Sequence, residues 1–169
     1  MYKSKKFKTL GPVEIKIDKT DRKIMKILQE NSKVTNLELS KMIGLSPAPT
    51  LERVKKLERG DVLSSYHAVV NPQTIGLNVN TFILVDLAWQ KPNVLDNFLK
   101  KINKIDEVLE CYIITGEADL ILRVICKDMA SYEELMFKKL SQIEEIERLK
   151  TMIALSKIKE SRVLPFDYK

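Results

Sequence analysis

The feature that most constrains the fold is a pair of helix starts, close together in the first third of the chain. Residues 35–38 read Thr-Asn-Leu-Glu, a capping box in which the Thr35 hydroxyl accepts a hydrogen bond from the Glu38 amide while the Glu38 carboxylate accepts one from the Thr35 amide. The helix that follows is predicted to end near residue 43, because Gly44 suits the left-handed turn beyond a helix. Ser46 then caps a second helix, with Pro47 at its first position, and this helix is predicted to continue to residue 59.

A third helix is predicted before these two, over residues 20–30. Ile24, Ile27 and Leu28 recur there at the spacing of one helix face, and Asp18 or Thr20 can cap the start. Three helices with a short glycine-containing turn between the second and the third form the helix-turn-helix pattern, whose last helix enters the major groove of DNA. We therefore predict that residues 18–61 fold as a DNA-binding domain.

The distribution of charge agrees with this prediction. Residues 1–70 contain 15 lysines and arginines against 8 aspartates and glutamates, whereas residues 71–169 contain 14 against 15. Only the first half of the chain therefore has the positive charge of a polyanion binder. Its basic start, residues 1–17, is predicted to be a mobile leader.

The helix over residues 46–59 has two distinct faces when its residues are placed about 100° apart. The face expected to pack on the other two helices consists of Ala48, Leu51, Val54 and Leu57. The face expected to meet DNA consists of Ser46, Pro49, Arg53 and Lys56, with Thr50 and Glu52 at its flanks. Arg53 is suited to a bidentate contact with guanine, while Lys56, Lys55 and Arg59 are candidates for phosphate contacts. The alternative is that these residues form only a solvated helix face.

The second half of the chain alternates between strand and helix patterns. Strands are predicted at 80–87, 108–115, 119–126 and 146–155, and helices at 94–103 and 132–140. A tight connection from Thr115 to Ala118 joins the two middle strands as a hairpin. This βαββαβ order predicts a ferredoxin-like domain over residues 80–169, joined to the helical domain by a strand and hinge at 62–79. The predicted fold class is therefore α+β.

Two of the predicted strands are apolar on both faces, notably at residues 82–85 and 120–122. Two helices cover only one face of a sheet, and an open apolar face favours association. We therefore expect a homodimer, whose symmetry would suit a palindromic site in double-stranded DNA.

Residues for catalysis are scarce. The single histidine, His67, lies in the predicted linking strand without a cysteine or carboxylate at catalytic or metal-ligand spacing. Cys111 and Cys126 lie in apolar runs and are expected to be small buried side chains. No glycine-rich phosphate loop or nucleophile motif occurs. The sequence predicts neither an enzyme nor a metal or cofactor site.

One place in the second half could bind a small molecule, the hairpin from Thr115 to Asp119. Gly116 permits close approach to the backbone, and Asp119 could accept a hydrogen bond from an ammonium group. The alternative is that the hairpin is only a good turn, with Asp119 fixing the loop.

The sequence resembles the Lrp/AsnC transcription regulators of bacteria and archaea in four stretches. These are residues 18–28 (DKTDRKIMKIL), 36–60 (NLELSKMIGLSPAPTLERVKKLERG), 66–72 (YHAVVNP) and 110–122 (ECYIITGEADLIL). The resemblance implies a winged helix-turn-helix domain followed by a ferredoxin-like RAM domain, in a cytoplasmic, nucleoid-associated regulator. It also implies dimers that assemble into tetramers or octamers, and an amino acid or related metabolite bound between dimers.

The resemblance also implies which residues hold the effector. They are Tyr112, Thr115, Gly116, Glu117 and Asp119, with Thr151 and Ile153 contributed by a neighbouring subunit. Leu120 departs from the family, because an aromatic residue is frequent at that position. An alternative function for the same DNA-reading helix is an architectural protein that wraps DNA and needs no ligand.

Overall fold

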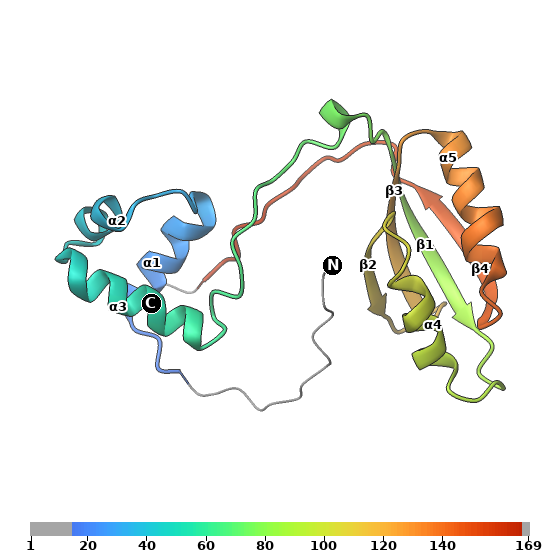
Figure 1. The fold of residues 1–169 in the computed structure, drawn as a ribbon, viewed down its shortest axis with the longest axis horizontal. Helices are drawn as coiled ribbons and strands as arrows, with labels where there is room; N and C mark the ends of the chain where they lie inside the picture. Colours follow the sequence, from blue (N-terminus) through green and yellow to red (C-terminus); the bar gives the residue numbers. More distant parts are fainter. Residues whose placement is uncertain (1–14, 167–169) are drawn as a thin grey trace. The chain divides into compact units, whose positions relative to one another are not determined.

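A computed structural model describes residues 15–166 of the chain. The chain divides into two compact units, which are described separately because their relative placement is not determined (Figure 1). One unit contains the described residues up to Val69 together with residues 160–166, and the other contains residues 70–159. The predicted mobile leader falls mostly outside the described residues. At its end, Ile17 packs against the core of the first unit.

Three helices form the first unit: α1 (Lys19–Glu30), α2 (Asn36–Ile43) and α3 (Pro47–Arg59). The predicted capping box at Thr35 and Glu38 starts α2, and a second capping box, made by Asp18 and Asp21, starts α1. The core between the helices is small and apolar, and its buried members are Ile24, Met25, Leu28, Leu39 and Leu57. The predicted helix-turn-helix is confirmed.

The turn between α2 and α3 depends on Gly44. Its φ of 75° lies in the left-handed region, where a side chain is unfavourable. The Gly44 amide donates to the Lys41 carbonyl and the Leu45 amide donates to the Ser40 carbonyl, so the end of α2 is closed by backbone hydrogen bonds. Across the turn, the Asn36 side-chain amide donates to the Pro47 carbonyl at 2.8 Å. These contacts fix the direction in which α3 leaves α2.

The predicted linking strand does not form within the described residues of the single chain. Residues 64–71 form no helix or strand, and Tyr66, Val69 and Val70 are exposed. A strand is stable only when its backbone amides and carbonyls have a partner strand, and this segment pairs with none of the described residues. The predicted hinge contains a short 3-10 turn, η1 (Gln73–Ile75), which Gly76 ends with a φ of 82°.

The second domain was predicted to extend to residue 169, but the sheet unit ends at residue 159. Residues 160–166 belong to the helical unit, because the Leu164 amide donates to the Gln29 side chain at 2.8 Å and Phe166 packs against the helical core. The helical unit is thus built from two separate parts of the sequence.

The second unit is a four-stranded antiparallel sheet covered by helices. Its strands are β1 (Val79–Leu87), β2 (Val108–Ile113), β3 (Leu120–Cys126) and β4 (Ile146–Ile153), in the order β2-β3-β1-β4. Helix α4 (Val94–Ile102) and helix α5 (Met129–Glu134) connect them, and α5 continues through a π turn (Leu135–Lys139) and a 3-10 turn (Leu140–Gln142) (Figure 1). The predicted α+β ferredoxin-like order is confirmed.

The two faces of this sheet differ. Ile83, Val85 and Leu122 are fully buried under Phe98 of α4 and Leu135 of α5. Because side chains alternate along a strand, the neighbouring residues lie on the opposite face, which no described helix covers. This open face has half-buried Phe82, Leu84 and Ile121 at its centre and exposed Met152 beside them. Among the residues described, none of the helices has the length and apolar character needed to cross a membrane.

Candidate nucleic-acid interface and ligand groove

Helix α3 is turned differently about its axis from the sequence prediction. Leu57 is buried and Val54 is half-buried, as predicted, but Ala48 and Leu51 are exposed. Thr50, predicted to flank the DNA-facing set, is fully buried, and its hydroxyl donates to the Ser46 carbonyl at 2.9 Å. The predicted position of Thr50 on the exposed face is therefore wrong. A buried hydroxyl that is satisfied by its own helix is a core residue.

Arg53 and Lys56 do not point freely into solvent either. The Arg53 guanidinium lies 2.6 Å from an Asp18 carboxylate oxygen and 2.8 Å from an Asp21 oxygen. The Lys56 ammonium lies 2.7 Å from the other Asp21 oxygen and also donates to the Lys16 carbonyl. The structure thus turns both cations toward the start of α1, away from the face that the sequence assigned to them.

These contacts shift the protonation equilibria of both acids. Burial on its own raises the pKa of the Asp21 carboxyl, but hydrogen bonds from Lys56 and Arg53 outweigh it and leave that pKa below its ordinary value. The pKa of Asp18 is also lowered, first by the backbone amide of Asp21 and then by Arg53. Both carboxylates are therefore charged at neutral pH.

The surface that α3 presents to solvent is made of other residues. Of the predicted DNA-binding set, Ser46, Pro49, Lys55 and Arg59 are exposed. The Lys55 ammonium lies 3.5 Å from the Glu52 carboxylate, an exposed pair one helical turn apart that contributes little to stability. The helical periodicity wrongly placed Ala48 and Leu51 on the buried face. A stripe of residues that contains Val54 and Leu57 can continue toward the start of the helix through Leu51 or through Thr50, and the buried one contains Thr50.

The predicted effector hairpin is present, and it is anchored to the central strand. Gly116 has a φ of 119°, a conformation suited to glycine. One carboxylate oxygen of Asp119 accepts hydrogen bonds from the Leu87 amide and from the Trp89 indole, each at 2.8 Å. Asp119 thus fixes the loop, which was the alternative reading, and Trp89 is an exposed aromatic neighbour that sequence reasoning did not single out.

The other predicted effector residues do not converge within one chain. Tyr112 lies on β2, at the opposite edge of the sheet from β4, and its hydroxyl donates to Glu110 at 2.9 Å. Thr151 shares a hydroxyl–hydroxyl hydrogen bond of 2.5 Å with Tyr132 of α5, on the helix-covered face. Ile153 is aligned with the same face and is exposed. Thr115 and Glu117 are exposed in the hairpin.

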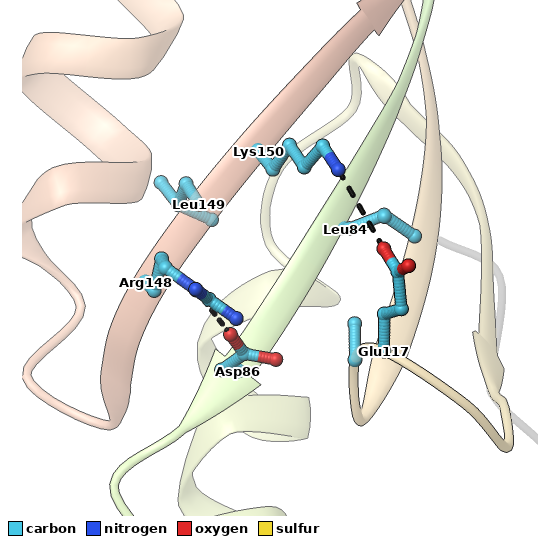
Figure 2. A pocket seen from close by; sticks show the side chains of 7 residues that line it. Leu84, Asp86, Glu117, Arg148, Leu149 and Lys150 are labelled. Atoms are coloured by element: carbon cyan, nitrogen blue, oxygen red, sulfur yellow. Dashed lines mark hydrogen bonds and ion pairs between the residues drawn. The ribbon is translucent and has the colours of Figure 1, made fainter.

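A groove of about 570 Å³ lies beside the hairpin on the open face of the sheet (Figure 2). Its walls carry two ion pairs, Asp86 with Arg148 at 2.6 Å and Glu117 with Lys150 at 3.6 Å. Leu84 lines the groove beside the Glu117–Lys150 pair (Figure 2). Of these residues only Glu117 was predicted. Asp86 could have been noticed as the charge that interrupts an apolar strand.

Both units match known protein families. The description of the model that matches residues 17–63 is winged helix-turn-helix DNA-binding, and that of the model matching residues 80–164 is Lrp/AsnC ligand binding domain. The second match alone spans half of the chain.

The protein belongs to the Lrp/AsnC family.

Curated and solved relatives agree with this membership. The chain is 34% identical to the leucine-responsive regulatory protein of Haemophilus influenzae and 32% identical to that of Klebsiella pneumoniae, over 88% of its length and 89% and 90% of theirs. Among solved structures it is similar to a transcriptional regulator of Neisseria meningitidis in complex with L-methionine, with a TM-score of 0.86, 33% identity and coverage of 89% of this chain and 97% of that one. An AsnC family regulator of Agrobacterium tumefaciens gives a TM-score of 0.83 at 32% identity, with 89% and 98% coverage.

These findings establish the general function of the Lrp/AsnC member described here. It is a DNA-binding transcription regulator with an amino-acid ligand-binding domain, and its fold is a winged helix-turn-helix followed by a four-stranded α+β domain. Its relatives are regulators, in agreement with the predicted lack of catalysis.

Proposed function

We propose that the regulator reads DNA with the exposed side of α3, and that Ser46, Pro49, Lys55 and Arg59 make the contacts. The observation that carries this proposal is that the cations of α3 fall into two groups, which differ in whether acids of α1 bind them. Lys55 and Arg59 are exposed, whereas Arg53 and Lys56 are held by acids of α1. Short side chains at the start of the helix let its N-terminal end approach base edges, and the two exposed cations suit phosphates, since the exposed pair of Lys55 with Glu52 is weak. Thr50 has no part in this surface.

The proposed DNA contacts are tested by the salt dependence of binding. DNA sites are first selected from a random pool, and binding to the selected duplex is measured by fluorescence anisotropy over a range of salt concentrations. Each phosphate contact contributes about 0.9 to the slope of log Kobs against log salt concentration. We expect Lys55→Gln and Arg59→Gln each to reduce that slope by about 0.9 for every copy of the chain bound to the duplex. Lys104→Gln, which removes an exposed cation from the sheet unit, serves as the control and leaves the slope unchanged. Unchanged slopes in both α3 variants would contradict the proposed surface.

We also propose that two chains associate through the open face of the sheet. The support is the apolar centre at Phe82, Leu84 and Ile121, which would be an aggregation hazard if it faced water. A two-fold symmetric pair places two copies of α3 on one DNA molecule and matches a palindromic site. Dimers would then assemble into tetramers or octamers in the cytoplasm, on the nucleoid.

The effector is proposed to be an amino acid bound in the groove beside the hairpin. A free amino acid carries one carboxylate and one ammonium group, and the groove offers cations, Arg148 and Lys150, alongside anions, Asp86 and Glu117. Leu84 provides an apolar floor for the ligand's side chain. The methionine complex of the Neisseria meningitidis relative supports this ligand class. A second chain on the open face would place the ligand between subunits.

Trp89 supplies the test of this effector site. It is the only tryptophan of the sequence and its indole donates to Asp119 of the hairpin, so its emission reports on the groove's neighbourhood. We expect one or more of the common amino acids to change Trp89 fluorescence in a saturable manner and to alter DNA affinity. Arg148→Ala is expected to weaken that ligand about tenfold or more, since a hydrogen bond to a charged group is lost.

The matched control for the effector test is Lys104→Ala, an exposed cation away from the groove, which should leave ligand affinity unchanged. A full response in Arg148→Ala would contradict the groove as the site. If no amino acid alters either fluorescence or DNA binding, the result instead favours the architectural, ligand-independent function.

A further inference from the structure

We infer that Asp18, Asp21, Arg53 and Lys56 form an ionic clamp that positions the DNA-reading helix, and that Arg53 and Lys56 act through this clamp and not on DNA. The inference rests on the DNA-binding function of α3. It replaces the sequence-based prediction that Arg53 reads guanine.

The central group of the clamp is the carboxylate of Asp21, which is fully buried. One of its oxygens accepts from Arg53 at 2.8 Å, and the other accepts from Lys56 at 2.7 Å and from the Asp18 amide at 3.2 Å. A buried anion is stable only when its oxygens are satisfied in this way. Asp21 therefore specifies the positions of two side chains of α3 at once.

Asp18 extends the same network to the start of α1. Its carboxylate accepts from the Asp21 amide at 2.8 Å with one oxygen and from Arg53 at 2.6 Å with the other. Both acids belong to the capping box that begins α1. The N-terminal end of α1 and the middle of α3 are thus joined by three charged hydrogen bonds: two from the Arg53 guanidinium and one from Lys56.

The apolar core leaves this positioning task to the clamp. On α3 only Leu57 and Thr50 are fully buried, with Val54 half-buried between them. A competing apolar stripe on the same helix, Ala48 with Leu51 and Val54, is exposed except for Val54. Turning α3 by the angle of one residue, about 100°, would exchange these stripes and change which side chains meet DNA. In the observed orientation Arg53 and Lys56 both reach Asp21.

The clamp also pairs two partly exposed cations of α3 with acids. Arg53 and Lys56 are balanced by two carboxylates, so the positive charge that α3 itself offers to phosphates comes from Lys55 and Arg59. A clamp residue and a DNA-contacting residue therefore differ in what they do to specificity and to salt dependence. This difference makes the inference testable.

The deciding experiment compares binding to a selected duplex with binding to a scrambled duplex for Asp21→Asn, Arg53→Gln and Arg53→Lys. The specificity ratio is the dissociation constant for the scrambled duplex divided by that for the selected duplex. This ratio is independent of the fraction of folded protein, so a merely destabilising change leaves it unaltered. We expect Asp21→Asn to lower the ratio at least tenfold, because α3 loses its orientation while the released Arg53 and Lys56 strengthen nonspecific binding. Glu30→Gln, which removes an exposed carboxylate from the other end of α1, is the matched control and keeps the wild-type ratio.

The Arg53 variants complete the test. Arg53→Gln should lower the ratio but retain the wild-type slope of log Kobs against log salt concentration, whereas Arg53→Lys, which can still pair with Asp21, should keep most of the specificity. The double variant Asp21→Asn with Arg53→Gln should lose no more specificity than the worse single variant, because the two side chains act as one unit.

Two results would overturn the inference. If Asp21→Asn kept its specificity while Arg53→Gln lost it, Arg53 would be reading a base directly. If Arg53→Gln reduced the salt slope by about 0.9 for every copy of the chain bound, Arg53 would contact a phosphate. Failure of the DNA-binding surface itself has a different signature, since Lys55→Gln and Arg59→Gln would then leave the slope unchanged.

Discussion

A single buried carboxylate, Asp21, illustrates how much one residue can determine in a small helical unit. It has no exposed surface, yet it remains charged because Arg53 and Lys56 donate to it and lower its pKa. Removing one partner of a buried ion pair leaves the other uncompensated, and the typical cost is about 3–5 kcal/mol. The stability of the helical unit should therefore depend on pH through this residue.

We predict that Asp21→Asn lowers the free energy of unfolding at pH 7 by about 3 kcal/mol. Because the pKa of Asp21 and that of Asp18 are lowered on folding, the stabilisation is fully present above their ordinary pKa of about 4 and is lost as the pH falls through the folded-state values. Urea unfolding followed by circular dichroism at pH 7 and pH 3 measures this. The difference between wild type and variant should shrink at the lower pH. A difference that is equal at both pH values would rule out the carboxylate as its source.

At the scale of elements, the turn between α2 and α3 sets the geometry of the helix-turn-helix. Gly44 ends α2 with a left-handed conformation, and beyond its two chain neighbours no residue comes within 4 Å of the position that a Cβ atom would take. A substitution there meets no steric clash, so its effect comes from backbone conformation alone.

We predict that Gly44→Ala destabilises the helical unit by about 1–2 kcal/mol, the cost of a left-handed conformation for a residue with a side chain. Gly44→Asn should lose less, because asparagine tolerates this conformation. Chemical denaturation of the three proteins gives the comparison. Equal stability of wild type and Gly44→Ala would mean that the turn adopts another conformation in solution.

The elements that the sequence predicts well are those that local signals specify. Thr35, Glu38 and Gly44 define α2 without reference to any other part of the chain, and each lies where it was predicted. The orientation of α3 was predicted wrongly because its decisive contact, between Arg53 and Asp21, joins residues far apart in the sequence. Similarly, the segment around Val69 has the residues of a strand but pairs with no strand among residues 15–166. Local pattern cannot supply a non-local partner.

The same reasoning applies to the ligand groove. Glu117 could be predicted because the hairpin is a local motif. Arg148 and Asp86 come from different strands and meet only through the pairing of β1 with β4. The register of that pairing was not available from the sequence. Family resemblance supplied the hairpin as a site but not the groove beside it.

At the scale of the whole molecule, the open face of the sheet is the surface through which we propose that chains associate. It combines an apolar centre, including Phe82 and Ile121, with charged pairs toward its margins. Buried apolar area provides the main driving force for association, and the charged margin fixes how the partner is placed.

We predict that Phe82→Asp converts the dimer into a monomer in sedimentation velocity experiments, because a charge would be buried without a partner in the interface. Phe137→Asp is the matched control. Phe137 is 70% exposed on the π turn of the helix layer, so its replacement should leave the dimer intact. A Phe82→Asp dimer of wild-type affinity would contradict association through the open face.

The packing of residues 160–166 on the helical unit has a consequence for how the protein is made. During synthesis, α1, α2 and α3 leave the ribosome before the entire sheet unit, while Phe166 and the Leu164 amide that binds Gln29 follow after it. The helical unit must therefore wait for the rest of the polypeptide before its own packing is finished. Deleting residues 160–166 would thus remove contacts from the helical unit, although in the sequence these residues follow the sheet unit.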